Sequence, residues 1–362
     1  MICSPSIISA RADAGQATSP AMSRPQLPNR KTRWLLFSVF AASLIVGCTP
    51  PPVESVAEVW GRKGLDDGRF IKPRAITIDG SDQLHIIDMT SRIQVFDRLG
   101  QLQKFWKTPE CVNGKPCGIS ILRDGRIAVP DTHYFRVLFY TPDGELLEDQ
   151  TIGGKNGRGD GEFGFLTDVV EDSKGNFYVS EYGDFDRIQK FDPNGKYLCA
   201  LGAHGTEQGE FLRPQGMVID GKDQLWVADA CNHRIQVFDA TTEPPTFKFT
   251  FGTSGRGIGE LNYPYNMLFD DEGFLYVCEF GNHRLQKFDA EGNSLGVWGG
   301  PGREPGQLHQ PWGMTLDSKG YFHVIDSYNH RVQRFKGVAL PGEEPVDCWS
   351  MGVSQNVVEH GT

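Results

Sequence analysis

The chain has 362 residues, of which 39% are hydrophobic and 23% are charged, an ordinary globular composition with ample length for a large core. Its 43 glycines and 22 prolines suit a protein of many short strands and turns. Beyond residue 47 it carries 31 basic and 45 acidic residues, a formal charge of −14, which argues against nucleic acid as a partner.

The first 47 residues have the pattern of a secretory signal. Residues 1–33 hold five basic side chains and one acid, and a 13-residue apolar run follows from Trp34 to Val46. That run is too short to span a membrane comfortably. Ile45–Cys48 resembles the bacterial lipobox, after which the cysteine is lipidated and becomes the mature N-terminus. The alternative is a plain signal peptide with a chance cysteine.

These observations predict how the chain begins and where it is located. We expect residues 1–47 to be a signal peptide with a lipobox, and residues 48–55 to be a lipidated Cys48 with a proline-rich tether. The protein would then lie outside the cytoplasm, in the periplasm or at the cell surface, anchored to a bacterial membrane by its N-terminal lipid.

A short sequence motif recurs six times, and each copy ends in an arginine followed by an apolar strand. The arginines stand 44, 51, 47, 50 and 47 residues apart, at Arg92, Arg136, Arg187, Arg234, Arg284 and Arg331. A period of this length indicates an array of similar supersecondary units. In the fourth unit, alternating residues predict strands over 216–220, 224–229, 234–239 and 246–251. Four strands per repeat predict a β-propeller with one blade per repeat.

The two ends of the array predict how the ring closes. Residues 54–69 match the fourth-strand segment that begins at Ser294, and the last repeat ends with its third strand near Phe335. Pairing these two segments would complete the last blade, so that this blade also has its fourth strand. We therefore expect an all-β, six-bladed β-propeller of four-stranded antiparallel blades over residues 56–336, closed by the N-terminal strand. Residues 337–362 form a C-terminal tail outside this count.

Three motifs resemble those of NHL-repeat proteins. They are the phrase Asn-His-Arg at 232–234, Pro-x-Gly before the first strand (214–216 and 311–313), and glycine-rich linkers such as 252–259. The resemblance covers residues 56–336 and implies a six-bladed propeller. It implies no single function, because the family includes scaffolds, RNA binders, sensor domains and a lyase.

Most of the repeated polar residues have a structural explanation. An acid ends the second strand of every unit, at Asp88, Asp131, Glu181, Asp229, Glu279 and Asp326. We expect each acid to pair with the arginine of its own unit rather than to bind a metal. His233, His283 and His330 hold one position in successive units, and we expect them to pack against the neighbouring blade. Cys111 and Cys117 are near enough in sequence to form a disulfide.

The candidate binding residues lie on the face where the inner strands begin and the second strand turns into the third. They vary from blade to blade, and they are Arg74, His133, Tyr134, Asp168, Tyr182, Gln215, Tyr265, Asn266 and Trp312. The same face would hold Cys117, Thr132, Asp184, Phe185, Phe280 and Tyr328. Aromatic rings with a few polar groups suit a protein, a peptide or a carbohydrate. The alternative is that they only plug the channel mouth.

Two classes of function remain. The favoured one is a lipid-anchored binding or scaffold module, monomeric, with an envelope protein, peptide or glycan as its partner and no cofactor. The alternative is a propeller enzyme of the lyase or lactonase type, with calcium or zinc as its metal. Asp168 is the only acid among the inner-strand positions, and one carboxylate does not make a metal site. An enzymatic function is therefore the less favoured interpretation.

Overall fold

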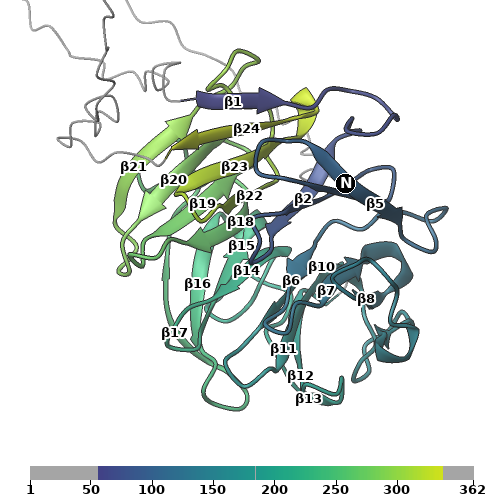
Figure 1. The fold of residues 1–362 in the computed structure, drawn as a ribbon. Coiled ribbons are helices and arrows are strands. Elements are labelled where there is room, and N and C mark those ends of the chain that lie inside the picture. The colour runs from purple at the N-terminus through teal and green to yellow at the C-terminus, as the bar shows by residue number, and fades with distance from the viewer. Residues whose placement is uncertain (1–55, 184, 337–362) are drawn as a thin grey trace, which may run out of the picture. The chain divides into compact units, whose positions relative to one another are not determined.

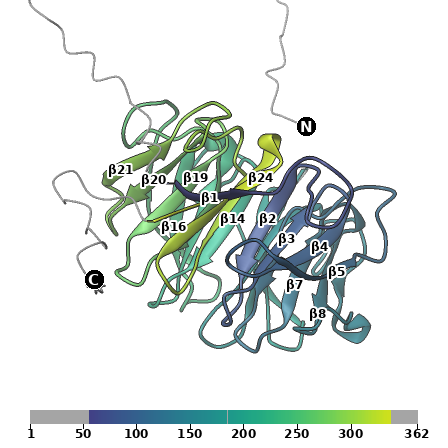
Figure 2. The same ribbon diagram turned by 45° about the horizontal axis from the view of Figure 1, so that its top comes forward.

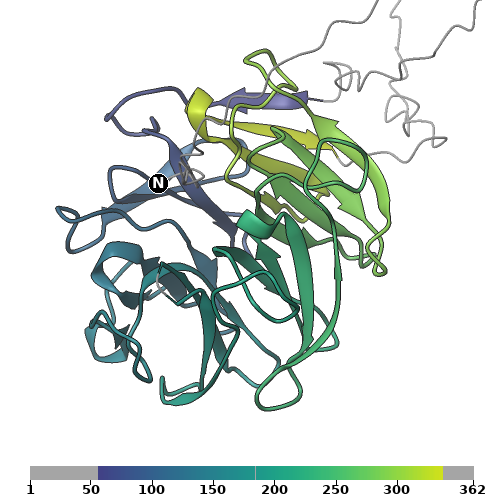
Figure 3. The same cartoon turned by 180° about the vertical axis from the view of Figure 1, so that it is seen from behind.

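The computed structural model describes residues 56–183 and 185–336 and shows six four-stranded antiparallel sheets arranged as the blades of a propeller (Figure 1). The views in Figures 2 and 3 show the same ring from two further directions. The predicted fold class is thereby confirmed. In these residues no helix has the length and apolarity needed to cross a bilayer. The predicted signal peptide, the lipidation at Cys48 and the C-terminal tail lie outside the described residues.

Each blade runs from an inner strand to an outer strand in chain order. Blade one contains β2 (Pro73–Ile78), β3 (Leu84–Asp88), β4 (Arg92–Phe96) and β5 (Leu102–Lys107). Blade two contains β6 (Ser120–Ile121), β7 (Ile127–Asp131), β8 (Arg136–Tyr140) and β9 (Ile152–Gly153). Blade three contains β10 (Phe165–Glu171), β11 (Phe177–Tyr182), β12 (Arg187–Phe191) and β13 (Tyr197–Leu201).

The remaining blades follow the same order. Blade four contains β14 (Pro214–Ile219), β15 (Gln224–Asp229), β16 (Arg234–Asp239) and β17 (Thr246–Phe251). Blade five contains β18 (Pro264–Phe269), β19 (Leu275–Glu279), β20 (Arg284–Phe288) and β21 (Ser294–Gly299). Blade six contains β22 (Gly313–Leu316), β23 (Tyr321–Asp326), β24 (Arg331–Lys336) and β1 (Val56–Trp60). Short 3-10 turns also occur: η2 (Thr132–Tyr134), η3 (Glu148–Gln150), η4 (Ala230–Asn232) and η5 (Ser327–Asn329).

Strand β1 closes the ring from the opposite end of the chain. It pairs antiparallel with β24, with Val56 opposite Phe335 and Trp60 opposite Val332, and Figure 1 shows the purple strand beside the yellow one. The Trp60 ring then packs on Phe96 of blade one, at 4.8 Å between centroids. The N-terminal strand therefore completes blade six and joins it to blade one.

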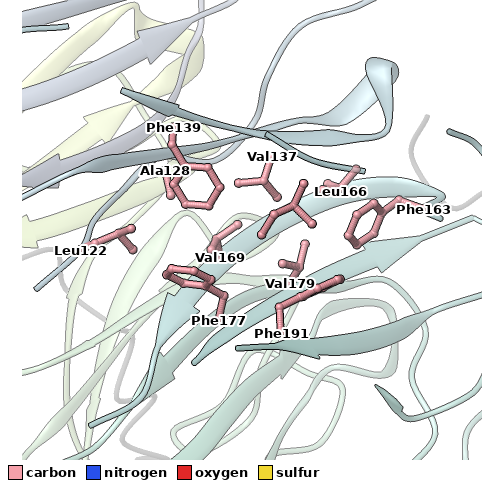
Figure 4. Close-up of a cluster of buried hydrophobic side chains, with 11 residues drawn as sticks. Leu122, Ala128, Val137, Phe139, Phe163, Leu166, Val169, Phe177, Val179 and Phe191 are labelled. Carbon is pink, nitrogen blue, oxygen red and sulfur yellow. The ribbon is translucent and has the colours of Figure 1, made fainter. Parts of the chain in front are cut away.

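The hydrophobic core is divided among the interfaces between blades. The larger clusters of buried side chains in the described part of the chain each combine residues of two neighbouring blades. Figure 4 shows one of them, where Phe139 of blade two meets Phe177 of blade three at 5.5 Å between ring centroids. Because every blade is packed on both sides, the ring is a rigid support for the residues at its two faces.

The predicted pairing of acid and arginine is confirmed in all six blades. The shortest nitrogen–oxygen distances run from 2.5 Å in blade five to 3.4 Å in blade one. In blade four, Arg234 also donates hydrogen bonds to the carbonyls of Thr206, Glu207 and Glu210 in the linker. The ion pair therefore fastens the preceding linker to the blade and is structural.

Blade two departs from this arrangement. Gln94, Gln189, Gln236, Gln286 and Gln333 stand two residues after the arginine in the other five blades and bond the linker backbone. Leu138 takes that position in blade two. The carboxylate of Asp131 bonds Arg136, but its Oδ1 is buried with no hydrogen-bond partner. Burial raises the pKa of Asp131 to about 6, partly offset by Arg136.

The repeated histidines link each blade to the next, as predicted. The Nδ1 atoms of His233, His283 and His330 accept hydrogen bonds from backbone N–H groups at the entry to the following blade. Burial lowers the pKa of all three rings, which favours the neutral, accepting form. Asp186 takes the same role in blade three and accepts from the Arg213 N–H at 3.0 Å.

Candidate functional site: the mouth of the axial channel

A proline lies at or just before the start of the inner strand in four blades, and the residue before it adopts the left-handed backbone conformation. Lys72, Arg213, Tyr263 and Gln310 have φ between +48° and +58°. This conformation is uncommon for residues other than glycine. The hydrogen bonds from the preceding blade hold it in place.

The glycine of the Pro-x-Gly motif allows inner strands to approach closely. A Cβ atom on Gly216 would lie 2.5 Å from the Tyr265 carbonyl oxygen of the next blade, and one on Gly118 would lie 2.5 Å from the Thr167 oxygen. Only glycine fits at such distances. The motif therefore sets how narrow the axial channel is.

The channel contains a small cavity that every blade helps to line. Its volume is about 30 Å³, room for about two water molecules. The lining includes all seven residues predicted at the entries of the inner strands: Arg74, Cys117, Asp168, Gln215, Tyr265, Asn266 and Trp312. The sequence therefore predicted correctly that residues up to 238 positions apart in the chain lie close together in the fold. His133, Tyr134 and Tyr182 do not line this cavity.

Two of the cavity residues also brace the ring. The Asp168 carboxylate accepts hydrogen bonds from the N–H of Val169 at 2.9 Å and of Met217 in the next blade at 2.8 Å. Asn266 accepts equivalently from the Met314 N–H at 3.0 Å. Burial raises the pKa of Asp168 to about 7, despite these hydrogen bonds. Both side chains therefore have a structural role that does not depend on a ligand.

One side of the mouth is formed by an aromatic cluster from blades five and six. Tyr265 stacks on Phe280 at 4.5 Å, Trp312 meets the Tyr265 ring at 5.0 Å, and Tyr328 lies 6.4 Å from Phe280. Tyr265 and Phe280 are each only 6% exposed. Trp312 and Tyr328 are partly exposed and offer their surface to a partner.

The other side of the mouth lies at blades two and three. His133 packs on Phe165 at 5.3 Å, and Phe165 packs on Tyr182 at 5.4 Å. Tyr134 instead lies beside Arg136, and its hydroxyl accepts from the Asn113 N–H at 3.1 Å. Asp184 lies outside the described residues.

The structure does not contain the disulfide considered for Cys111 and Cys117. Both thiols are free. The Cys117 Sγ lies 3.1 Å from the Thr132 hydroxyl and contacts the Leu166 carbonyl, so it is engaged within the channel wall. Burial raises the pKa of the Cys117 thiol, which makes it a poor nucleophile.

Two cations at the mouth, Lys72 and Arg213, were missed in the sequence. Lys72 Nζ lies 4.1 Å from the centre of the Tyr328 ring, and Arg213 lies 4.7 Å from Tyr182 and 5.6 Å from Tyr265. Arg74 joins them, 5.2 Å from the Trp312 ring. The signal was present, because Lys72 and Arg213 each directly precede the proline that opens an inner strand.

The donor set in the cavity does not fit a catalytic metal. Asp168 is its one carboxylate, and both its oxygens already accept backbone N–H bonds. Over residues 56–183 and 185–336, no cluster of three or more His, Cys, Asp or Glu side chains is placed to hold a metal ion. A metal of the lyase or lactonase type would need more free acidic or imidazole ligands.

Comparison with known proteins bears out the repeat. The NHL repeat model matches residues 211–238 and 308–335. NHL repeat-containing protein 3 of Mus musculus is 28% identical over 165 residues, 43% of this chain and 47% of that protein. Peptidylglycine alpha-amidating monooxygenase of Rattus norvegicus is 34% identical over 140 residues, 35% of this chain and 14% of that protein. The chain thus spans less than half the length of these curated relatives.

Among solved structures, a streptogramin B lyase matches with a TM-score of 0.55 and 13% identity, over 76% of this chain and 96% of that one. At that identity the likeness concerns the fold alone. The six observed blades show that the chain is a six-bladed β-propeller, and two of its repeats match the NHL repeat model.

Proposed function

We propose that this propeller is a binding module that holds a protein partner across the mouth of its axial channel. The observation that carries the proposal is the gathering of unrepeated aromatic and cationic side chains on one face of an otherwise repeating frame. Tyrosine, tryptophan and arginine are the side chains that most often dominate protein interfaces. The propeller fold is compatible with a scaffold or binding role, and the site decides between that role and others.

The size of the cavity favours a partner that lies across the face. Sites that enclose a small molecule have volumes of about 300–1,000 Å³, whereas the axial cavity measures about 30 Å³. A sugar or a drug-sized substrate therefore does not fit inside the channel. A protein surface or peptide can rest on the partly exposed Trp312, Tyr328 and Tyr182.

An enzymatic role of the lyase type is the second candidate, since an amidating monooxygenase and a streptogramin B lyase are among the similar proteins. The cavity argues against it. Its single carboxylate is already hydrogen-bonded, and its thiol has a raised pKa, so no nucleophile and base stand together there.

Two tyrosines on opposite sides of the mouth test the binding proposal. We expect the double change Tyr182→Ala and Tyr328→Ala to reduce capture of partners, crosslinked in intact cells, by about tenfold or more, because interface tyrosines carry much of the binding energy. Tyr321→Ala is the matched control, since Tyr321 begins β23 at the opposite face beside Arg334. Equal capture by the double variant, the control and the unaltered protein would remove the support for this face.

We further propose that the module is anchored outside the cytoplasm through a lipid on Cys48. The basic segment, the short apolar run and the lipobox-like Ile45–Cys48 motivate this part. We expect Cys48→Ser to move most of the protein from the membrane fraction to the soluble fraction. The expected cause is loss of the acyl chains, since each buried methylene contributes about 0.8 kcal/mol to membrane binding. Quantitative blotting of both fractions measures this, and an unchanged distribution would contradict lipid anchoring at Cys48.

A further inference from the structure

Two cations at the mouth of the channel lack the carboxylate partners that the repeated arginines have. In the described part of the chain, neither Lys72 nor Arg74 has an acid within ion-pair distance, and both lie over aromatic rings. The body of the protein is strongly acidic, with 45 acidic residues after residue 47. Two cations without an acid, close together in such a protein, attract negative charge to this place.

Two buried hydrogen-bond donors at the same place have no acceptor. They are the Nε of Arg74 and the indole Nε1 of Trp312, and both side chains line the axial cavity. The Arg74 guanidinium lies 5.2 Å from the Trp312 ring, so both donors belong to one locality. Neither group can accept a hydrogen bond, so each needs an acceptor atom, which a water or the oxygen of a ligand can supply. A buried donor without a partner is a significant free-energy loss.

The cavity carboxylate does not satisfy these donors. Both oxygens of Asp168 accept backbone N–H bonds from Val169 and Met217. Burial also raises the pKa of Asp168 to about 7, which weakens its negative charge near neutral pH. The remaining space, room for about two water molecules, matches the two oxygens of one carboxylate.

We propose that the mouth of the channel binds a side-chain carboxylate of an acidic segment in a protein partner, with Arg74 and Trp312 as its donors. This inference rests on the binding function proposed above and names the chemistry of its ligand. A segment of a protein fits better than a free anion, because the partly exposed Tyr328 and Trp312 can contact the residues that flank the acid. Lys72, held over the Tyr328 ring, adds positive charge at that rim.

A pair of peptides tests the inference on the whole chain. One fluorescein-labelled hexapeptide carries two glutamates between glycines and serines, and the other carries glutamines in their place. Fluorescence anisotropy should show the glutamate peptide binding about tenfold or more tightly, since charge-assisted hydrogen bonds are lost with glutamine. Arg74→Met and Trp312→Phe should each weaken the glutamate peptide about tenfold and leave the glutamine peptide unchanged.

The controls separate this role from folding. Trp312→Phe keeps an aromatic ring and removes the donor, and unfolding midpoints show that each variant is folded. Arg98→Met is the matched control, because Arg98 is a 39% exposed arginine in a turn at the opposite face. It should bind both peptides as the unaltered protein does.

Several outcomes would overturn the inference. They are equal binding of the two peptides, no saturable binding of either, and an equal loss in Arg98→Met and Arg74→Met. Displacement of the peptide by acetate at the same carboxylate concentration would overturn the assignment to a protein segment. If capture of a partner depends on Tyr182 and Tyr328 but not on Arg74, the binding function stands and the carboxylate site fails. If capture depends on none of the three, the binding function itself fails.

Discussion

Replacing Arg234 with methionine should lower the free energy of unfolding by about 3–5 kcal/mol, because removing one partner of a buried ion pair usually has an effect of this size. The Arg234 Nε lies 2.8 Å from the carboxylate of Asp229, which is 0% exposed. The same guanidinium donates to three linker carbonyls at 2.7–2.9 Å. Methionine keeps the apolar stem but leaves the buried Asp229 carboxylate without its cation and the carbonyls of Thr206 and Glu207 without the Arg234 donors, while Gln236 still bonds the Glu210 carbonyl. Urea unfolding followed by circular dichroism measures the loss.

Blade two supplies the matched control for this change. Arg136 bonds Asp131 and the half-exposed Glu110, and among the described residues it makes no bond to a linker carbonyl. Because burial already raises the pKa of Asp131 to about 6, that carboxyl takes up a proton at little cost when its partner is removed. We therefore expect Arg136→Met to cost only about 1–2 kcal/mol. An equal loss in both variants would show that the linker bonds do not contribute.

The fold could be predicted from the sequence because each repeat carries the same pattern of strands and turns. Three strands of blade four have the predicted bounds, and only the inner strand differs, since β14 begins at Pro214 rather than at Gly216. The cause is a bulge: Pro214 pairs with Asp229 but Met217 pairs with Val227, which hides the alternation at the start of the strand. Periodicity cannot reveal a register shift of this kind.

The candidate site could be predicted only in part, for a related reason. Inner-strand residues such as Arg74 and Gln215 line the cavity because topology alone brings the strand entries together. Tyr134 and His133 lie in the 3-10 turn η2, which is followed by Phe135 with φ +56°. Individual contacts fix the conformation of that loop, such as the bond from the Asn113 N–H to Tyr134. Nothing in the repeat predicts such contacts.

Rigidity of the frame connects the fold to the proposed binding role. The donors of Arg74 and Trp312 come from blades one and six, which are neighbours across the point where the ring closes. The inner strands of these two blades, β2 and β22, contact each other directly, and the pairing of β1 with β24 and the packing of Trp60 on Phe96 hold the same two blades together. A ring that opened there would disturb the site as well as the core.

Removing strand β1 should therefore have the largest effect of any change in the propeller. We compare a chain that begins at residue 55 with one that begins at residue 61, which lacks Val56–Trp60. The shorter chain leaves β24 as an unpaired edge and removes the Trp60 ring from Phe70 and Phe96. The combined loss of a strand and a packed tryptophan exceeds about 5 kcal/mol, comparable with the whole stability of many domains.

We expect the chain from residue 61 to be largely unfolded or aggregated at 25 °C, while the chain from residue 55 unfolds at the same urea concentration as the full chain. A synthetic peptide of residues 54–62, added to the shorter chain, should restore part of the folded signal, because β24 offers it the same antiparallel edge that β1 occupies. A peptide with Trp60 replaced by alanine should restore less, since it lacks the contact with blade one. If the two chains instead share one unfolding midpoint, the pairing of β1 with β24 is not what holds the ring closed, and the core between blades one and six must do so alone.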